Sequence, residues 1–341
     1  MKFNWVNEDY PSSCPVYFEL AYLNLFAAQN RSTAKVLRIE SGQGVAWLPL
    51  ELRQIGPDRW EASSAYGYGG LFSAAAVQVS LHEWHHLMDF LASQKIICVF
   101  LRHAPFLQNH LFWPTEKRTT NRKTYARTLQ SESTLAGLCA DIDQKLRWSI
   151  HAALRQNLQV EFHGGPNWNR QDVAAFYDIY QRLMHEKQTN PFYVFSEQFL
   201  LDHATAFGAQ CELALVRNAE TRQIMAGAIF LLDKKDDDNW VHYHLSASER
   251  SASSGQAVEL LVASAIVHYG NRGYRHLHLG GGHSLEETDG LSRFKKKFST
   301  SILNYEISTW ICDEQAYMVE RNRLALQHPS HFLIHDSRGA M

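Results

Sequence analysis

Hydrophobic and polar positions alternate with two different periods along the first half of the chain, which predicts both helices and strands. Residues 16–29 are apolar and aromatic, as in a packed helix. Residues 34–52 form two apolar runs joined at Ser41-Gly42-Gln43-Gly44, which predicts a strand hairpin. A helix within residues 75–93 and a buried strand over residues 96–101 are expected next.

The middle of the chain contains a longer segment with helical periodicity. Apolar residues recur every four positions from Ile142 to Leu154, which predicts one amphipathic helix over residues 135–157. Phe162-His163-Gly164-Gly165-Pro166-Asn167 then concentrates turn-forming residues. We therefore expect two domains, residues 1–159 and 160–320, followed by a C-terminal tail over residues 321–341.

The second half repeats a mixture of helices and strands. One helix is expected to be capped by Asp172 and the next by Ser196, since such side chains accept hydrogen bonds from the first backbone N–H groups of a helix. Three strands, a buried helix and a fourth strand are expected over residues 212–217, 223–232, 240–247, 256–269 and 274–279. The predicted fold class is α/β with mixed sheets.

Composition and charge exclude several classes of protein. Apolar residues make up 45% of the chain, and 33 basic side chains nearly balance 35 acidic ones, so no global field favours nucleic acid or an anionic membrane. The five cysteines are widely spaced without a C-x-x-C pair, as in reduced proteins. The first residues lack a secretory signal, and no apolar run is long enough to span a membrane. We expect a cytoplasmic protein.

The loop Arg250-Ser251-Ala252-Ser253-Ser254-Gly255 lies between a predicted strand and the buried helix. A short Gly/Ser loop that opens onto a helix exposes free N–H groups at the positive end of the helix dipole, so it can hold an anion. A plain helix cap with a polar loop is the alternative interpretation.

A second candidate segment contains Gly280-Gly281-Gly282 followed by residues 289–298. Glycines at a strand end allow another backbone or a ligand to approach closely. On the predicted helix, Lys295 lies nearer the apolar face than Arg293 or Lys296. Lys295 can therefore donate to the oxyanion that forms when an amine attacks an ester carbonyl, whereas a solvated basic face is the alternative.

The glycine triplet, the D-G-L-x-x-F-K-x-x-F series at residues 289–298 and the preceding strand and helix resemble the FemAB-like branch of the GNAT acyltransferase superfamily. The resemblance is strongest over residues 160–312 and extends to Tyr66-Gly67-Tyr68-Gly69-Gly70, which is similar to the glycine-tyrosine loop of that branch. It implies two tandem GNAT-like acyl-CoA N-acyltransferase domains, with the acceptor between them.

The resemblance also implies roles for individual residues. Lys295 matches the lysine that stabilises the tetrahedral intermediate. The implied substrate-binding residues are Tyr66, Tyr68, Tyr243, His283, Arg293 and Phe294, and the implied donor-binding residues are Arg250, Ser254 and Gly255. Ser253 stands where the superfamily's pyrophosphate loop has its first glycine.

These residues lead to one expected function and two alternatives. The chain is expected to transfer an acyl or aminoacyl group from acyl-CoA, an acyl carrier protein or aminoacyl-tRNA to an amine-bearing acceptor, such as a cell-wall or surface-polysaccharide precursor, without a tightly bound cofactor or metal. The first alternative is a zinc hydrolase, because His82-Glu83-Trp84-His85-His86 fits H-E-x-x-H. The second is a non-catalytic binding protein that retains the fold.

Overall fold

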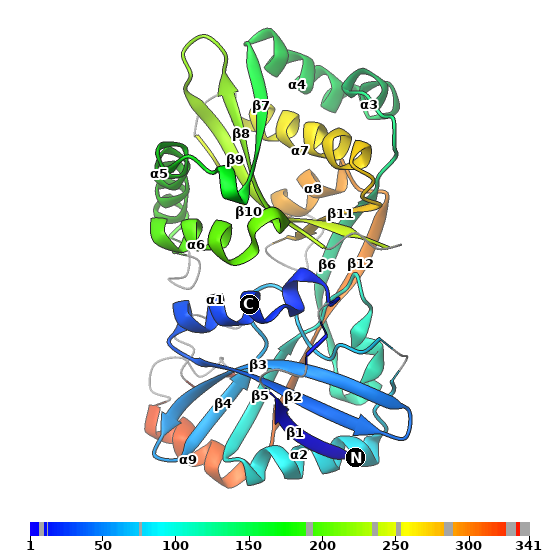
Figure 1. Ribbon diagram of the computed structural model, residues 1–341, viewed down its shortest axis with the longest axis vertical. Helices are drawn as coiled ribbons and strands as arrows, with labels where there is room; N and C mark the ends of the chain where they lie inside the picture. The colour runs from blue at the N-terminus through cyan, green and yellow to red at the C-terminus, as the bar shows by residue number, and fades with distance from the viewer. Residues whose placement is uncertain are drawn as a thin grey trace. The chain divides into compact units, whose positions relative to one another are not determined.

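The computed structural model describes residues 1–6, 10–11, 13–74, 77–188, 194–233, 238–249, 254–282, 289–324 and 332–334. The chain forms two compact units, which are labelled by element in Figure 1. Unit 1 comprises Met1–Arg122 and Asn304–Met341, and unit 2 comprises Lys123–Leu303. Among the described residues, no helix combines the length and the apolar character that crossing a bilayer requires.

Unit 1 is built around a mixed sheet. Neighbouring strands are antiparallel from β1 to β4, β4 and β5 are parallel, and β12 is antiparallel to β5. The strands are β1 (Lys2–Val6), β2 (Thr33–Ser41), β3 (Gly44–Gly56), β4 (Arg59–Ser63), β5 (Ile96–Arg102) and β12 (Ser301–Ile311). The helices are η1 (Val16–Phe18), α1 (Leu20–Asn30), α2 (Leu81–Ser93), η2 (Asn109–Phe112), η3 (Thr115–Lys117) and α9 (Glu314–Leu324).

Unit 2 has the same strand pattern. Strands β7 to β10 are antiparallel neighbours, β10 and β11 are parallel, and β6 is antiparallel to β11. The strands are β6 (Thr119–Thr128), β7 (Leu158–Gly164), β8 (Cys211–Asn218), β9 (Ile224–Leu232), β10 (Trp240–Ser248) and β11 (His276–Gly281). The helices are α3 (Leu135–Asp141), α4 (Gln144–Arg155), η4 (Gly165–Asn167), α5 (Arg170–Glu186), α6 (Glu197–Phe207), η6 (Gly208–Gln210), α7 (Ser254–Asn271) and α8 (Gly290–Lys296).

Each unit thus joins its parallel strand pair through one helix, α2 between β4 and β5 and α7 between β10 and β11. Both helices are buried against apolar side chains of their own sheet, since Leu87 and Leu91 of α2 and Leu260 and Leu261 of α7 are at most 1% exposed. The architecture is mixed α/β with the same strand pattern in both units, which confirms the predicted fold class.

Three local expectations were wrong. The helix predicted over residues 135–157 is broken into α3 and α4, because the Asp143 carboxylate accepts hydrogen bonds from the N–H groups of Lys145 and Leu146 and starts a new helix. The residue that caps α5 is Asn169 and not Asp172. Residues 162–164, which were predicted to belong to a turn, are the end of strand β7, because pairing with β8 extends as far as Gly164. Ser196 caps α6 as expected.

The expected domain limits at residues 159 and 320 differ from the limits of the compact units. Residues 123–159 lie in unit 2, and residues 304–320 lie in unit 1. In each unit, the strand next to the parallel pair in the sheet comes from a distant part of the sequence. This strand is β12 beside β5 in unit 1 and β6 beside β11 in unit 2. The domain limits at residues 159 and 320 remain a prediction.

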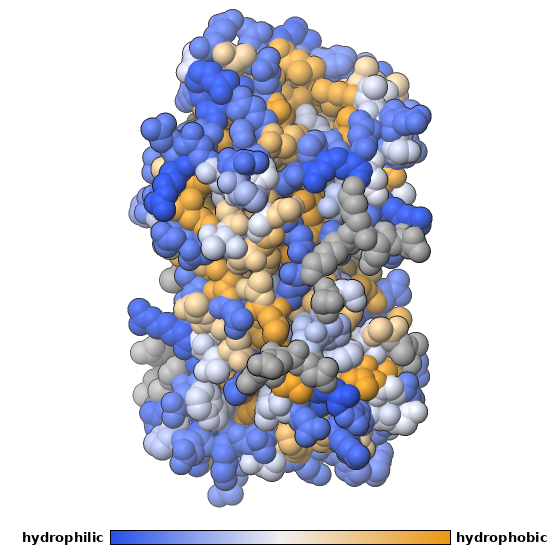
Figure 2. All heavy atoms as spheres, viewed as in Figure 1, coloured by the Kyte–Doolittle hydropathy of each residue, from blue (hydrophilic) through white to orange (hydrophobic). Residues whose placement is uncertain are grey.

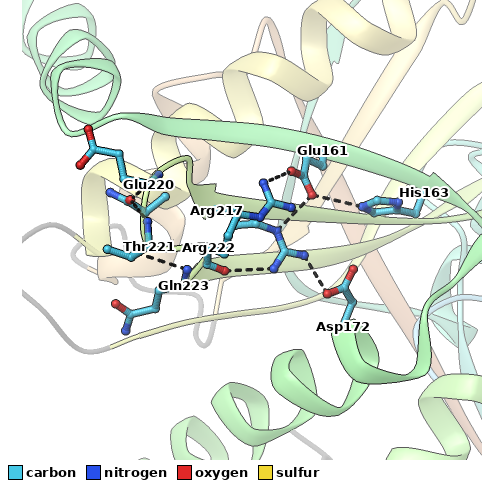
Figure 3. A network of polar contacts seen from close by, with 9 residues as sticks. Glu161, His163, Asp172, Arg217, Glu220, Thr221, Arg222 and Gln223 are labelled. Carbon is cyan, nitrogen blue, oxygen red and sulfur yellow. Dashed lines mark hydrogen bonds and ion pairs between the residues drawn. The ribbon is translucent and has the colours of Figure 1, made fainter.

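An ion-pair network fixes the edge of the unit 2 sheet (Figure 3). Arg217 of β8 is only 7% exposed and donates to Glu161 of β7 at 3.1 Å and to Asp172 of α5 at 2.8 Å. Arg222 also donates to Glu161, at 3.0 Å. Burial alone raises the pKa of Glu161, but the hydrogen bonds and charges of Arg217 and Arg222 outweigh burial and hold that pKa below its usual value.

This network predicts a pH-dependent contribution to stability. Because the pKa of Glu161 is lower in the folded chain, its ionised form stabilises the fold above the usual value of 4.5, and the contribution is lost as the pH falls through the folded pKa. Glu161→Gln should therefore lower the thermal unfolding midpoint at neutral pH and lower it less in acid. Glu220→Gln, in the turn between β8 and β9, is the control. An equal loss for Glu161→Gln at every pH would contradict the prediction.

Candidate functional site

Lys295 is the inward-facing cation of helix α8. Its side chain is 8% exposed, whereas Arg293 and Lys296 are exposed. The Lys295 Nζ donates a hydrogen bond to the carbonyl oxygen of Gly281, at 2.7 Å, at the end of strand β11. The helical spacing therefore identified the buried lysine correctly, and a charged donor is held where the glycine strand ends.

The glycines bring α8 into direct contact with the end of β11. A Cβ atom at Gly282 would lie 1.9 Å from the Ser292 Oγ and 2.1 Å from the Asp289 Oδ2. Asp289 is also the cap of α8, since its carboxylate accepts from the N–H groups of Leu291 and Ser292. Only a residue without a side chain fits here, so Gly282 determines how closely the helix that carries Lys295 packs on the strand.

The two parallel strands of unit 2 pair only along part of their length. Pairs join residues 240–242 of β10 to residues 276–278 of β11, while β10 continues to Ser248 and β11 to Gly281. The register against the outer neighbours shifts near His244 in β10 and near Leu279 in β11, as in β-bulges. Within the described part of these strands, their facing backbone edges therefore separate just before the glycines.

Tyr243 lies where the separation begins. Its ring packs 5.5 Å from the Phe230 ring, and burial raises the pKa of Tyr243 to about 12. The phenol is therefore protonated at neutral pH and can donate a hydrogen bond. Phe294, next to Lys295 in the sequence, packs against the same apolar cluster as Tyr243.

Several histidines of β10, β11 and α6 are buried. His278 and His242 are each 1% exposed, and their rings lie 5.7 Å apart. Burial, with contributions from His242 and Lys295, holds the pKa of His278 well below its usual value. His244 and His203 lie 5.4 Å apart, and burial lowers the pKa of both. Apart from the alternation of His276 and His278, no pattern in the sequence indicated this group.

Tyr66 and Tyr68 belong to an aromatic cluster in unit 1. The Tyr68 ring lies 5.1 Å from Tyr17 and 5.6 Å from Tyr305, and both contacts are edge-on. The Tyr66 carbonyl accepts a hydrogen bond from the Tyr22 hydroxyl at 2.8 Å. Both tyrosines of the loop are half-buried.

The other predicted binding residues are only partly described. Ser254 and Gly255 begin α7, and Gly255 is exposed. Among the described residues, no atom lies within 4 Å of the place that a Cβ atom of Gly255 would take. Arg250 and His283 lie outside the described residues. Arg293 is exposed on α8 beside the buried lysine.

The H-E-x-x-H sequence has a structural use in α2. The Glu83 carboxylate accepts hydrogen bonds from the backbone N–H and the hydroxyl of Ser80, at 3.0 and 2.8 Å, which completes a capping box. His82 and His86 lie on one face, with ring centroids 4.2 Å apart, and both are exposed. In the described part of the chain, no three metal-binding side chains gather. The arrangement therefore gives no support to a zinc hydrolase.

Residues 141–296 match the sequence model of a family described as acetyltransferase (GNAT) domain. No curated protein matches the chain in sequence.

Solved structures share the fold of nearly the whole chain. FemX is 12% identical with a TM-score of 0.61, covering 90% of this chain and 96% of its own. L-PGS from Bacillus licheniformis is 13% identical with a TM-score of 0.52, covering 90% and 96%. A tandem GNAT protein from the clavulanic acid biosynthesis pathway is 9% identical with a TM-score of 0.51, covering 91% and 99%.

Gly282→Ala should loosen the site. The added methyl group would overlap the Ser292 hydroxyl and the Asp289 cap, so we expect a destabilisation on the order of 1–3 kcal/mol and a lower thermal unfolding midpoint. Gly290→Ala is the matched control, because no atom of the described residues lies within 4 Å of a Cβ atom there. Equal midpoints for the two variants would show that α8 does not pack on β11 in this way.

Proposed function

We propose that the chain is an N-acyltransferase that acts on an amine-bearing acceptor in cell-wall or surface-polysaccharide biosynthesis. The match of residues 141–296 to the sequence model described as acetyltransferase (GNAT) domain supports this proposal. The acyl or aminoacyl donor is a thioester or an aminoacyl-tRNA. The observation that carries this proposal is the burial of Lys295 at the end of β11, where the parallel strands separate. The likeness to FemX and L-PGS supports the fold of such an enzyme.

The separated strands offer a place for the extended part of a donor. Beyond residue 242, β10 pairs with β9, and beyond residue 278, β11 pairs with β6, so each strand is held firmly by its outer neighbour. The amide groups of an extended donor arm can then pair with the facing backbone edges as an added strand would. This arrangement directs the acyl carbonyl toward the glycines and Lys295.

Lys295 supplies the charge that the transition state needs. When the amine nitrogen bonds to the acyl carbon, the carbonyl oxygen becomes an oxyanion, and the Lys295 ammonium group donates a hydrogen bond to it. The C–S bond of a thioester, or the C–O bond of an aminoacyl ester, then breaks. The leaving thiolate or alkoxide takes the proton that the amine loses, or this proton passes to solvent and the leaving group is protonated from solvent. His278 is neutral beside Lys295, so the lysine does not face a second buried cation there.

The remaining predicted residues take binding roles. Tyr243, protonated because its pKa is about 12, donates to the acceptor or the leaving group. Tyr66 and Tyr68 present aromatic faces suited to a sugar or peptide acceptor. Arg293, Phe294 and His283 complete the substrate side, and Arg250, Ser254 and Gly255 hold the donor's phosphate groups at the N-terminus of α7.

Lys295→Ala should separate catalysis from donor binding. We expect kcat to fall by about 10²-fold or more while the Kd for the donor stays nearly unchanged, because an oxyanion donor acts only in the transition state. The assay follows thiol release from acetyl-CoA with a panel of amino sugars, and calorimetry follows donor binding.

Lys296→Ala removes an exposed cation from the next position and should leave kcat unchanged. An unaltered kcat in Lys295→Ala would remove Lys295 from the mechanism. Donor binding without transfer to any amine, in the wild type as in both variants, would indicate a binding protein that retains the fold.

A further inference from the structure

The outer face of α4 combines an exposed aromatic side chain with positive charge. Trp148 is 60% exposed, although tryptophan usually buries most of its surface. Lys145, His151 and Arg155 are also exposed and lie three or seven positions from Trp148, so they share its side of the helix. Helix α4 contains no acidic residue. We call this surface the α4 face.

The flank of the α4 face is also apolar and cationic. Leu154 is 43% exposed, and helical spacing puts it beside His151 and Arg147. The Arg147 guanidinium is held in place, because its Nη2 donates to the carbonyl oxygens of Ala140 and Ile142 at 3.3 and 3.1 Å. In Figure 2, apolar residues are exposed among hydrophilic ones in the region where Figure 1 labels α4.

The α4 face lies next to the first turn of α7. The Gln156 Nε2, just after α4, donates to the Gln256 Oε1 at 2.6 Å. Gln256 follows Gly255. In the proposed function, the donor's phosphate groups bind at this turn. A donor that is larger than a nucleotide therefore has its remaining bulk within reach of α4.

We propose that the α4 face docks an acidic carrier protein that bears the acyl group as a phosphopantetheine thioester. This inference rests on the proposed function, because the thioester must enter between β10 and β11 while its phosphate rests at α7. Carboxylates of the carrier pair with Lys145, Arg147 and Arg155, and an apolar side chain of the carrier packs on Trp148. A central aromatic anchor with a charged rim is the usual anatomy of a specific protein interface.

Two other occupants fit the α4 face less well. A tRNA would be held by many phosphate contacts along a basic stripe, whereas this face has an apolar centre and the whole chain has a net charge of −2. A second copy of this chain would bring the same cations of both copies together across a symmetric interface, and like charges oppose such pairing.

Binding measurements on the full chain test the inference directly. Calorimetry compares three probes: a bacterial acyl carrier protein with its phosphopantetheine arm, the same carrier without the arm, and coenzyme A. We expect Trp148→Ala to weaken binding of the armed carrier about tenfold or more and to change the Kd for coenzyme A by less than about twofold. The double variant Lys145→Glu, Arg155→Glu should act likewise, and salt should weaken binding of the wild type to the armed carrier more than binding to coenzyme A.

Arg170→Glu is the matched control, since Arg170 is an exposed cation of α5 in the same unit. Thermal midpoints equal to the wild type show that a variant is folded. The inference is overturned if the armed carrier binds no more tightly than coenzyme A, or if the α4 variants bind it as the wild type does. It is equally overturned if tRNA binds and Trp148→Ala abolishes that binding. These failures leave the Lys295 assay, and with it the proposed function, unaffected.

Discussion

The site of unit 2 depends on one close contact, the packing of α8 against the end of β11. A buried ammonium group is costly unless it is paired, and the hydrogen bond from Lys295 to the Gly281 carbonyl supplies that pairing. The contact is possible because Gly282 has no side chain where Asp289 and Ser292 lie. The Asp289 cap, the close packing of α8 on β11 and the position of the Lys295 ammonium group therefore depend on one another.

The rest of unit 2 holds this contact in register. Strand β11 is fixed by β10 along its first residues and by β6 to its end, and α7 covers the sheet from one side with an apolar, fully buried face. The bulges near His244 and Leu279 turn the two parallel strands away from each other without breaking their outer pairing. A firm sheet with a local opening is what a transferase needs in order to orient an extended donor.

Burial controls the protonation of several side chains in unit 2. Low pKa values leave His203, His244 and His278 neutral at physiological pH, and the high pKa of Tyr243 keeps its hydroxyl protonated. His278, whose pKa is lowered by burial and by the charge of Lys295, therefore adds no second positive charge beside the lysine. At the edge of the sheet, the buried Arg217 guanidinium is paired with the carboxylates of Glu161 and Asp172.

The sequence by itself determined the class of fold, most strands and helices, and the choice of Lys295 over its neighbours, because local periodicity reports which side of an element is buried. It also indicated the GNAT-type domain from the glycine triplet and the segment after it. Only the tertiary structure decided that Asp143 starts a new helix before the second half and that Glu83 completes the capping box of α2. It also decided that β6 pairs with β11 and that β12 pairs with β5, although the two strands of each pair are far apart in the sequence. These features arise from hydrogen bonds and packing between particular atoms, often in distant segments of the chain. The pattern of hydrophobic and polar residues does not specify such contacts.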